Sequence, residues 1–169
     1  MLKNMRPAMA ENGKQTDLRL EDFLPYRLSV LSSRVSASLA EIYRERFGIL
    51  IPEWRVLANL DRFAPLSAAA LAQYSSLDKV QVSRTISRMV KAGLITRQTD
   101  PDDQRAVILR LSERGQKLFD QITPLALAWE AEFLCDLDPQ EIALLDDLLA
   151  RLEKKADQIS LSGKGRNIA

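Results

Sequence analysis

The sequence predicts a mainly α-helical protein with one small β-hairpin. Over most of the chain the apolar residues recur at three- and four-residue steps, the spacing of one face of an α-helix. Residues 94–99 and 104–111 change to alternation, and the turn sequence Asp100-Pro101-Asp102-Asp103 joins them. The 169 residues include only 6 Gly and 7 Pro, few for an all-β protein, and 46% of them are apolar.

Three helices are predicted in the first half of the chain. The first covers residues 21–46 and ends at Gly48, a common helix terminator. The second covers residues 52–63 and begins with a proline, which suits the first turn of a helix. The third covers residues 67–75. Its first residue, Ser67, is expected to cap the helix, and this role is favoured over a phosphate contact.

The helix predicted over residues 78–92 has two unlike faces. It opens at Asp78, and one face carries the apolar side chains Val82, Ile86, Met89 and Val90. The other face carries Lys79, Gln81, Ser83, Arg84, Ser87, Arg88 and Lys91. No acid follows the cap, whereas an inert solvated face normally mixes both signs. Cations suit phosphates, and hydroxyl, amide and guanidinium groups suit base edges, so this face predicts DNA binding.

Positions along this helix suggest different roles. Gln81, Ser83 and Arg84 lie near its N-terminus, where a recognition helix meets the base edges of the major groove. Arg88 and Lys91 are expected to contact phosphates. Gln81 has a second interpretation, because it stands three residues after the cap and could complete a capping box.

Two more helices complete the chain and define its organisation. One begins at Ser112 and extends to about residue 134. The other begins at residue 138, carries a stripe of leucines from Leu144 to Leu152 and extends to residue 157. The predicted parts are a flexible arm (1–20), a dimerisation helix (21–50), a DNA-binding domain (51–111), C-terminal dimerisation helices (112–157) and a disordered tail (158–169). Packing of the apolar stripes within one subunit is the alternative to a dimer.

Charge and composition narrow the classes of function. Residues 76–110 carry seven basic and four acidic side chains, net +3, while residues 112–157 carry five basic and eleven acidic ones, net −6. A basic middle segment favours a polyanionic partner. The chain has no histidine, which disfavours an enzyme, a metal site and a cofactor. It also lacks a membrane-spanning run and a secretory signal and has a single cysteine, all typical of a cytoplasmic protein.

The segment TDPDDQRAV, residues 99–107, could be a calcium loop, a catalytic carboxylate pair or a turn. A calcium loop needs a glycine at the sharp bend and a closing glutamate, and this segment has neither. A catalytic pair needs a desolvated pocket, whereas these acids stand at a polar hairpin tip. Proline between aspartates is typical of a turn, which is therefore the favoured interpretation.

Four segments together resemble the MarR family of bacterial transcription regulators. They are PEWRVLANL, LAQYSSLDKVQVSRTISRMVKAGLI, DPDDQRAVILRLSERG and LDPQEIALLDDLLARLE, and the resemblance extends from about residue 23 to residue 157. It implies a winged helix-turn-helix with a helical dimerisation arm. The sequence departs from the family at Ile51, where a Ser or Thr cap is usual, at a cost of about 1 kcal/mol.

The resemblance implies roles for further residues. Arg105 would enter the minor groove, and Asp103 would hold nearby cations in place. The protein would be a homodimeric repressor on a pseudo-palindromic operator in double-stranded DNA. A small effector, often an aromatic acid, would bind between the arm and the DNA-binding lobe, and an acyl-CoA is a second possibility. Candidate effector contacts, chosen by position only, are Tyr26, Arg27, Arg34, Tyr43, Trp54 and Trp129. A core position is the favoured alternative for Trp54.

Two other functions stay open at this point. A winged helix can bind protein instead of DNA, although the cationic face of residues 78–92 argues against it. A redox-switched regulator could use Cys135, but acidic neighbours oppose the thiolate that such a switch needs.

Overall fold

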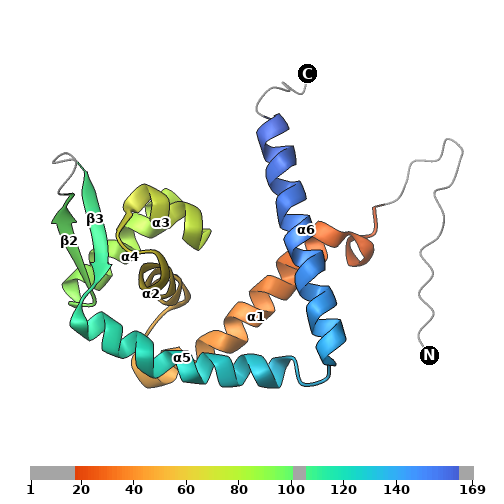
Figure 1. Cartoon of the computed structure of the whole chain (residues 1–169), viewed down its shortest axis with the longest axis horizontal. Coiled ribbons are helices and arrows are strands. Elements are labelled where there is room, and N and C mark those ends of the chain that lie inside the picture. Colours follow the sequence, from red (N-terminus) through yellow and green to blue (C-terminus); the bar gives the residue numbers. More distant parts are fainter. Residues whose placement is uncertain (1–17, 101–105, 164–169) are drawn as a thin grey trace, which may run out of the picture. The chain divides into compact units, whose positions relative to one another are not determined.

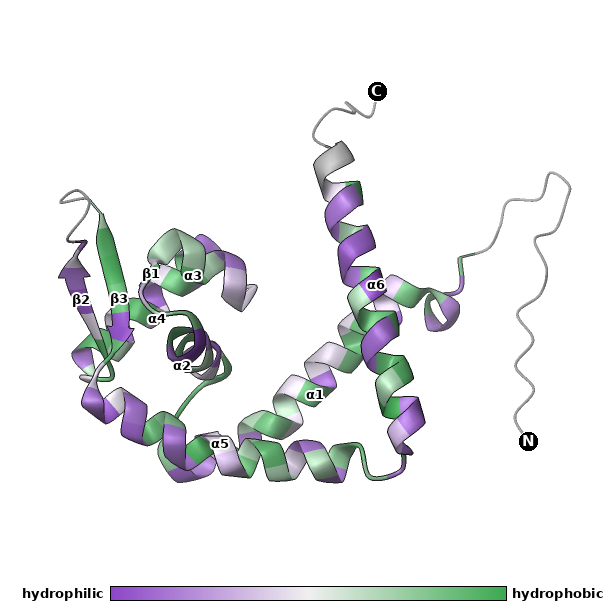
Figure 2. Ribbon diagram, in the orientation of Figure 1, coloured by the Kyte–Doolittle hydropathy of each residue, from purple (hydrophilic) through white to green (hydrophobic). Residues whose placement is uncertain are grey.

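The computed structural model describes residues 18–100 and 106–163. The chain divides into two units, residues 1–38 and 39–169. The first unit holds a 3₁₀ turn, Leu20–Asp22, and the beginning of α1. The elements are α1 (Leu24–Phe47), α2 (Ile51–Phe63), β1 (Leu66–Ser67), α3 (Ala68–Ser75), α4 (Lys79–Lys91), β2 (Ile95–Thr99), β3 (Val107–Leu111), α5 (Glu113–Phe133) and α6 (Pro139–Gly163). Figure 1 labels all of them except β1, which is labelled in Figure 2. The mainly helical fold with a small β-hairpin is confirmed.

The sheet has one strand more than the sequence predicted. β1 pairs with β3, and β3 pairs with β2, all antiparallel, in the order β1-β3-β2. Leu109 at the centre of β3 stands opposite Leu66 on one side and Arg97 on the other. β1 has only two residues, too few to alternate, so no periodicity could reveal it.

Glycines end two of the helices. Gly48 and Gly93 have φ angles of 66° and 70°, a conformation that costs a residue with a Cβ more than it costs glycine. After α4 the chain turns back sharply, and the Leu94 amide donates to the Met89 carbonyl at 2.9 Å. Both predicted terminators are confirmed.

α2 begins without a capping hydroxyl, as the sequence indicated, but its N-cap residue is Leu50 and not Ile51, because the helix starts one residue before Pro52. Instead the Glu53 carboxylate reaches back, and its Oε2 accepts the Leu50 amide at 2.8 Å. This bond is the returning half of a capping box and satisfies one of the free amides at the helix start.

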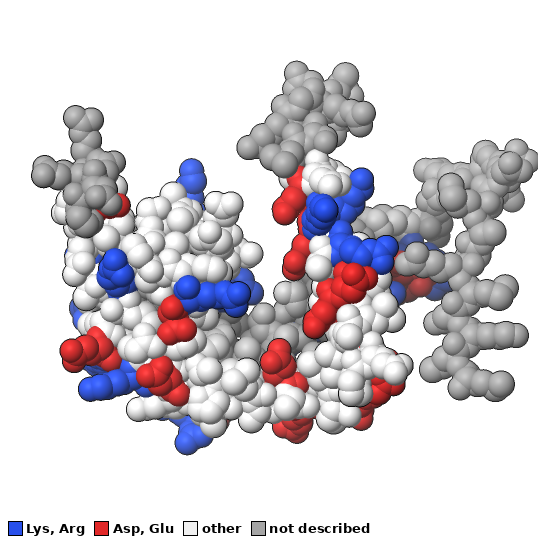
Figure 3. Space-filling view, in the orientation of Figure 1, with Lys and Arg blue, Asp and Glu red and all other residues white. Residues whose placement is uncertain are grey.

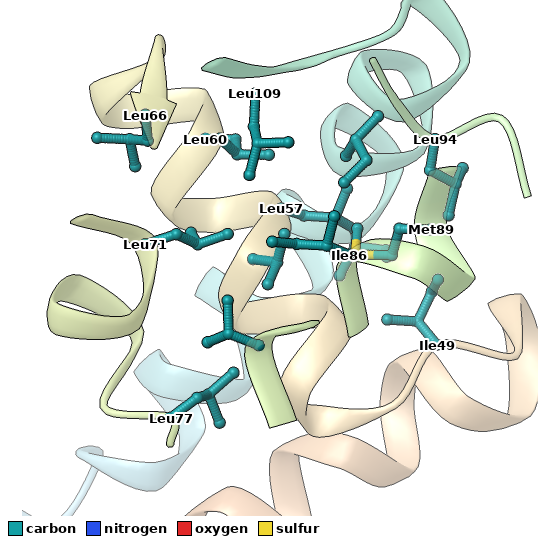
Figure 4. Packing of buried hydrophobic residues seen from close by; sticks show 14 of the residues in the cluster. Ile49, Leu57, Leu60, Leu66, Leu71, Leu77, Ile86, Met89, Leu94 and Leu109 are labelled. Atoms are coloured by element: carbon teal, nitrogen blue, oxygen red, sulfur yellow. The ribbon is translucent and has the colours of Figure 1, made fainter. Parts of the chain in front are cut away.

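α2 is the centre of the second unit and contacts α3, α4, α5 and β3. Figure 4 shows Leu57 and Leu60 from α2 among side chains from α3, α4 and the sheet. Val56, Leu57 and Leu71 are completely buried, and Ile122 of α5 is buried with them. This core holds α4 against the rest of the lobe and leaves one side of α4 free.

α6 carries its leucines on the surface of the single chain, and Figure 2 shows hydrophobic and hydrophilic residues mixed along it. The helix runs to Gly163, so the disordered tail predicted from residue 158 is wrong at its start. Ile159 continues the apolar stripe, and Gly163 is the first glycine in α6, so nothing stops the helix earlier. Among the described residues no helix is long and apolar enough to cross a bilayer. Of the arm predicted over residues 1–20, residues 1–17 lie outside the described part.

Candidate nucleic-acid interface

α4 is fixed at its start by a side-chain cap. Asp78 Oδ1 accepts the Gln81 amide at 2.8 Å, and the Asp78 carbonyl accepts the Val82 amide at 2.9 Å. The predicted cap is confirmed. Among the described residues no bond returns from the Gln81 side chain to the Asp78 backbone, so the exposed Gln81 amide does not complete a capping box.

The buried side of α4 differs from the prediction at one position. Val82, Ile86 and Met89 are buried as expected, but the fourth buried side chain is Thr85, and Val90 is 36% exposed. A helix advances about 100° per residue, so Thr85 completes the face that Val82 and Met89 define. Val90 is therefore left at the edge of the core.

All seven polar residues predicted for the DNA-facing side are exposed. They are Lys79, Gln81, Ser83, Arg84, Ser87, Arg88 and Lys91. Basic and acidic side chains are mixed over α6 in Figure 3, but no acid follows Asp78 within α4. Of the two hydroxyls, Ser87 donates to the Ser83 carbonyl at 2.9 Å, so its oxygen remains free to accept.

Arg88 has a partner that the sequence did not indicate. Its Nε lies 2.9 Å from Oε1 of Glu53, whose side chain is 6% exposed, while the Arg88 side chain is 58% exposed. The other Glu53 oxygen accepts the Leu50 amide. One buried carboxylate therefore joins the start of α2 to the exposed face of α4 and offsets the charge of Arg88.

A groove of about 390 Å³ separates α4 from the hairpin and the start of α3. Lys79, Ser83 and Ser87 line it from α4, Ala68 and Ala69 line it from α3, and Arg97 lines it from β2. Sequence reasoning missed Arg97 as a site residue, and nothing in its local pattern distinguishes it from Arg110 on β3. Only the pairing of β2 with β3 brings it beside the cations of α4.

The hairpin closes through its backbone, because the Asp100 amide donates to the Ala106 carbonyl at 2.9 Å. Asp103 and Arg105, predicted for the wing, lie outside the described residues.

The predicted effector residues do not form one cluster in the second unit. Tyr43 is only 1% exposed and stacks on Trp54, which also stacks on Phe119, both with centroids 5.6 Å apart. Burial raises the pKa of the Tyr43 phenol, although nearby Arg55 opposes the shift. Tyr43 and Trp54 therefore serve the packing of α1, α2 and α5, which supports the core interpretation of Trp54.

Trp129 stacks on Phe133, with centroids 5.1 Å apart, and lines a separate groove between α1 and α5. Three acids, Glu41, Glu45 and Glu132, and one cation, Arg46, line the same groove, so its net negative charge is poorly suited to an anion. In the first unit, Tyr26, Arg27 and Arg34 line an open hollow on α1 of about 510 Å³.

A further cavity, of about 600 Å³, was not anticipated. It lies between the α1–α2 junction, the end of α4 and the start of α5. Its charged lining consists of the cations Arg88, Arg114 and Lys117 and the acids Glu53 and Glu113, and apolar side chains complete it. These residues are far apart in the sequence, so no local signal could have grouped them.

Comparison with known proteins identifies similar sequences and folds. A model described as the MarR family matches residues 47–106. A MarR/EmrR family transcriptional regulator from Acinetobacter sp. ADP1 is 26% identical, with a TM-score of 0.77, over 83% of this chain and 99% of its own. A MarR family regulator from Silicibacter pomeroyi is 27% identical, with a TM-score of 0.72, over 81% and 91%.

A third similar structure is that of a DNA-binding protein regulated by a small molecule. It is BpsR of Bordetella bronchiseptica, whose DNA binding is regulated by 6-hydroxynicotinic acid. It is 20% identical, with a TM-score of 0.72, over 81% of this chain and 97% of its own, which is a likeness of fold.

Proposed function

The chain belongs to the MarR family of winged-helix transcription regulators, and on this premise we propose that it binds specific double-stranded DNA as a homodimeric repressor. The observation that carries the proposal is the exposed side of α4, which carries Lys79, Arg84, Arg88 and Lys91 and has no acid of its own after the cap. A cationic helix of this kind fits the major groove. We propose that the protein is not an enzyme and that it acts in the cytoplasm.

Each predicted contact keeps its role in this proposal. Gln81, Ser83 and Arg84 read base edges, while Lys79 and Lys91 contact phosphates. Ser87 accepts hydrogen bonds from DNA. Arg88 donates to a phosphate with the amino groups that Glu53 leaves free. Arg97 is added to the phosphate contacts, because it lines the same groove as Lys79.

The wing completes the interface through Arg105, which enters the minor groove while Asp103 orients it. The test is Arg105→Ala, for which we expect weaker binding and a smaller dependence on salt. An unchanged affinity together with an unchanged salt dependence would rule the contact out.

The homodimer is supported by the apolar side chains left exposed on the arm helices. On α6 they include five leucines between 39% and 58% exposed, which are Leu144, Leu145, Leu148, Leu149 and Leu152. A two-fold dimer would bury them and place two copies of α4 about one DNA turn, roughly 34 Å, apart. Leu148→Glu is expected to give monomers in sedimentation velocity, and Glu153→Gln on the same helix is the control.

The effector is proposed to be a small anionic aromatic compound that shifts the dimer from a DNA-competent to an incompetent state. BpsR, with the same fold, responds to such a compound. Tyr26, Arg27 and Arg34 remain candidate contacts. The cavity beside the start of α5 offers a second place for an anion, because Arg114 and Lys117 outnumber Glu113 there once Glu53 is paired with Arg88.

The deciding experiment is fluorescence anisotropy with the region upstream of its own gene. We expect a Kd of about 10⁻⁸ M or tighter at physiological salt and at least roughly a thousandfold weaker binding to an unrelated duplex. The double variant Arg84→Ala, Lys91→Ala should weaken binding to both duplexes through the lost phosphate contact and reduce the preference through the lost base contact. Equal affinity for both duplexes would refute sequence-specific binding, and no binding to either duplex would favour a protein-binding winged helix. Release of DNA by hydroperoxide in the native protein but not in Cys135→Ser would favour the redox alternative, for which Cys135 is exposed.

A further inference from the structure

Val80 is an apolar residue on the exposed side of α4, where sequence reasoning considered only polar side chains. It stands in the first turn of α4, on the side opposite the buried residues, and its side chain is 58% exposed. Two other side chains, Ser83 and Arg84, follow it by three and four residues and so neighbour it on the helix surface. Val80 therefore lies among the residues proposed to read base edges.

Neither packing nor helix formation accounts for valine at this position. The core side of α4 is already occupied by Val82, Thr85, Ile86 and Met89. A β-branched residue lowers helix propensity, and the first turn is already fixed by Asp78. In the free protein, then, Val80 contributes little to stability while it exposes an apolar surface.

The chemistry of the major groove offers one matching group. Base edges there present hydrogen-bond donors and acceptors, which valine cannot use, and the 5-methyl group of thymine, which it can contact. We propose that Val80 contacts a thymine methyl in each half of the operator and so selects thymine over cytosine at that position. This inference rests on the proposed DNA-binding function.

The test removes the methyl and nothing else. Full-length protein would first select its preferred duplex from a random pool, and each thymine in that duplex would then be replaced by deoxyuridine. We expect one thymine in each half-site at which the native protein loses about fourfold in affinity, the factor for burying one methyl-sized group. Replacing both positions should cost about fifteenfold, since distant sites add.

The Val80→Ala variant, which loses both γ-methyl groups, should show a clearly smaller difference between the thymine and deoxyuridine duplexes than the native protein. The matched control is Val90→Ala, because Val90 is the other exposed valine of α4 but lies at its C-terminal end. It should keep the discrimination of the native protein. Thermal melting should show both variants folded, since both side chains are exposed.

Two outcomes would count against the inference. Specific binding with no methyl-sensitive thymine would overturn it, and so would unchanged discrimination in Val80→Ala, while DNA binding itself stood. Failure of the native protein to select any sequence would overturn the proposed function instead, and this inference with it.

Discussion

Glu53 and Arg88 form an ion pair of unequal burial, in which the acid is inside and the cation is outside. Arg88 Nε lies 2.9 Å from Glu53 Oε1, and the side-chain exposures are 58% and 6%. Glu53 also accepts the Leu50 amide at 2.8 Å. The carboxylate has lost its water and depends on these two donors, whereas Arg88 keeps much of its hydration.

The unequal burial predicts unequal costs of mutation. Arg88→Met leaves a buried carboxylate with one amide partner, and we expect the free energy of unfolding to fall by about 2–3 kcal/mol. Glu53→Gln leaves an arginine that water can reach and an amide oxygen that can still accept from Leu50, so we expect a loss of about 1 kcal/mol. Urea denaturation measures both.

The double variant Glu53→Gln, Arg88→Met tests the same prediction through the sum of the two single losses. With both charges removed no buried charge is left unpaired, so the loss should be smaller than the sum of the two single losses. Arg84→Met, which changes an exposed arginine of the same helix, should cost less than about 0.5 kcal/mol. Equal single losses that simply add would mean that the pair is solvated and contributes nothing.

The same pair predicts which cations of α4 set the salt dependence of DNA binding. Each phosphate contact adds about 0.9 to the slope of log affinity against log salt. Lys91→Gln should remove about one contact per protomer. Arg88→Gln should reduce the slope by less, because the Glu53 carboxylate already offsets its charge. Affinity titrations between 50 and 300 mM salt, roughly the useful range, would resolve this difference.

Arg151 provides the control for that experiment. It pairs with Asp147 on α6, outside the proposed interface, so Arg151→Gln should leave the slope unchanged. An equal reduction by Arg88→Gln and Lys91→Gln would show that Glu53 does not offset the charge of Arg88 in the complex.

Gly115 is a position in α5 at which we expect alanine to lower the stability of the protein, although alanine favours helix formation. A Cβ at this position would overlap the carbonyl oxygen of Leu94. That carbonyl also accepts the Ser112 amide at 3.0 Å, so it cannot move without breaking the junction between α4, β2 and α5. Alanine has the better helix propensity by about 1 kcal/mol, yet we expect Gly115→Ala to lose about 2–3 kcal/mol of stability through overpacking.

Thermal or urea unfolding of Gly115→Ala would test this expectation. Gln121→Ala, at an exposed position of the same helix, is the control and should be nearly neutral. Stabilisation by Gly115→Ala would mean that helix propensity outweighs the close contact.

The sequence predicted helices where apolar spacing was long and regular, and caps where Ser67 and Asp78 precede such spacing. Ser67 indeed accepts the Ala70 amide at 3.1 Å. Periodicity could not separate Thr85 from Val90, because both border the same face and valine is the more apolar. It also could not reveal β1, which is two residues long, because such a strand is defined by its partner β3.

The candidate site, too, has a part that a local sequence pattern predicts and a part that depends on packing between distant segments. The polar side of α4 was predictable, because one helix presents it. The Glu53–Arg88 pair and the place of Arg97 depend on packing between distant segments, which no local pattern encodes. Tyr43 and Trp54 were chosen as effector contacts by position, but aromatic residues at such positions pack equally well into a core, and here they do.

The buried phenol of Tyr43 makes stability depend on alkaline pH. Burial raises its pKa above the ordinary value of 10.0. Between the unfolded and folded values the native state holds a proton that the unfolded chain has lost, so unfolding releases it. Stability from this group is therefore complete below pH 10 and falls as pH rises, by at most about 1.4 kcal/mol per pH unit.

Tyr43→Phe should flatten the decline in the free energy of unfolding that urea denaturation measures between about pH 10 and 11. Tyr74→Phe removes a 52% exposed phenol and should follow the native curve. If the curves of Tyr43→Phe and the native protein stay parallel, the Tyr43 phenol ionises equally in both states.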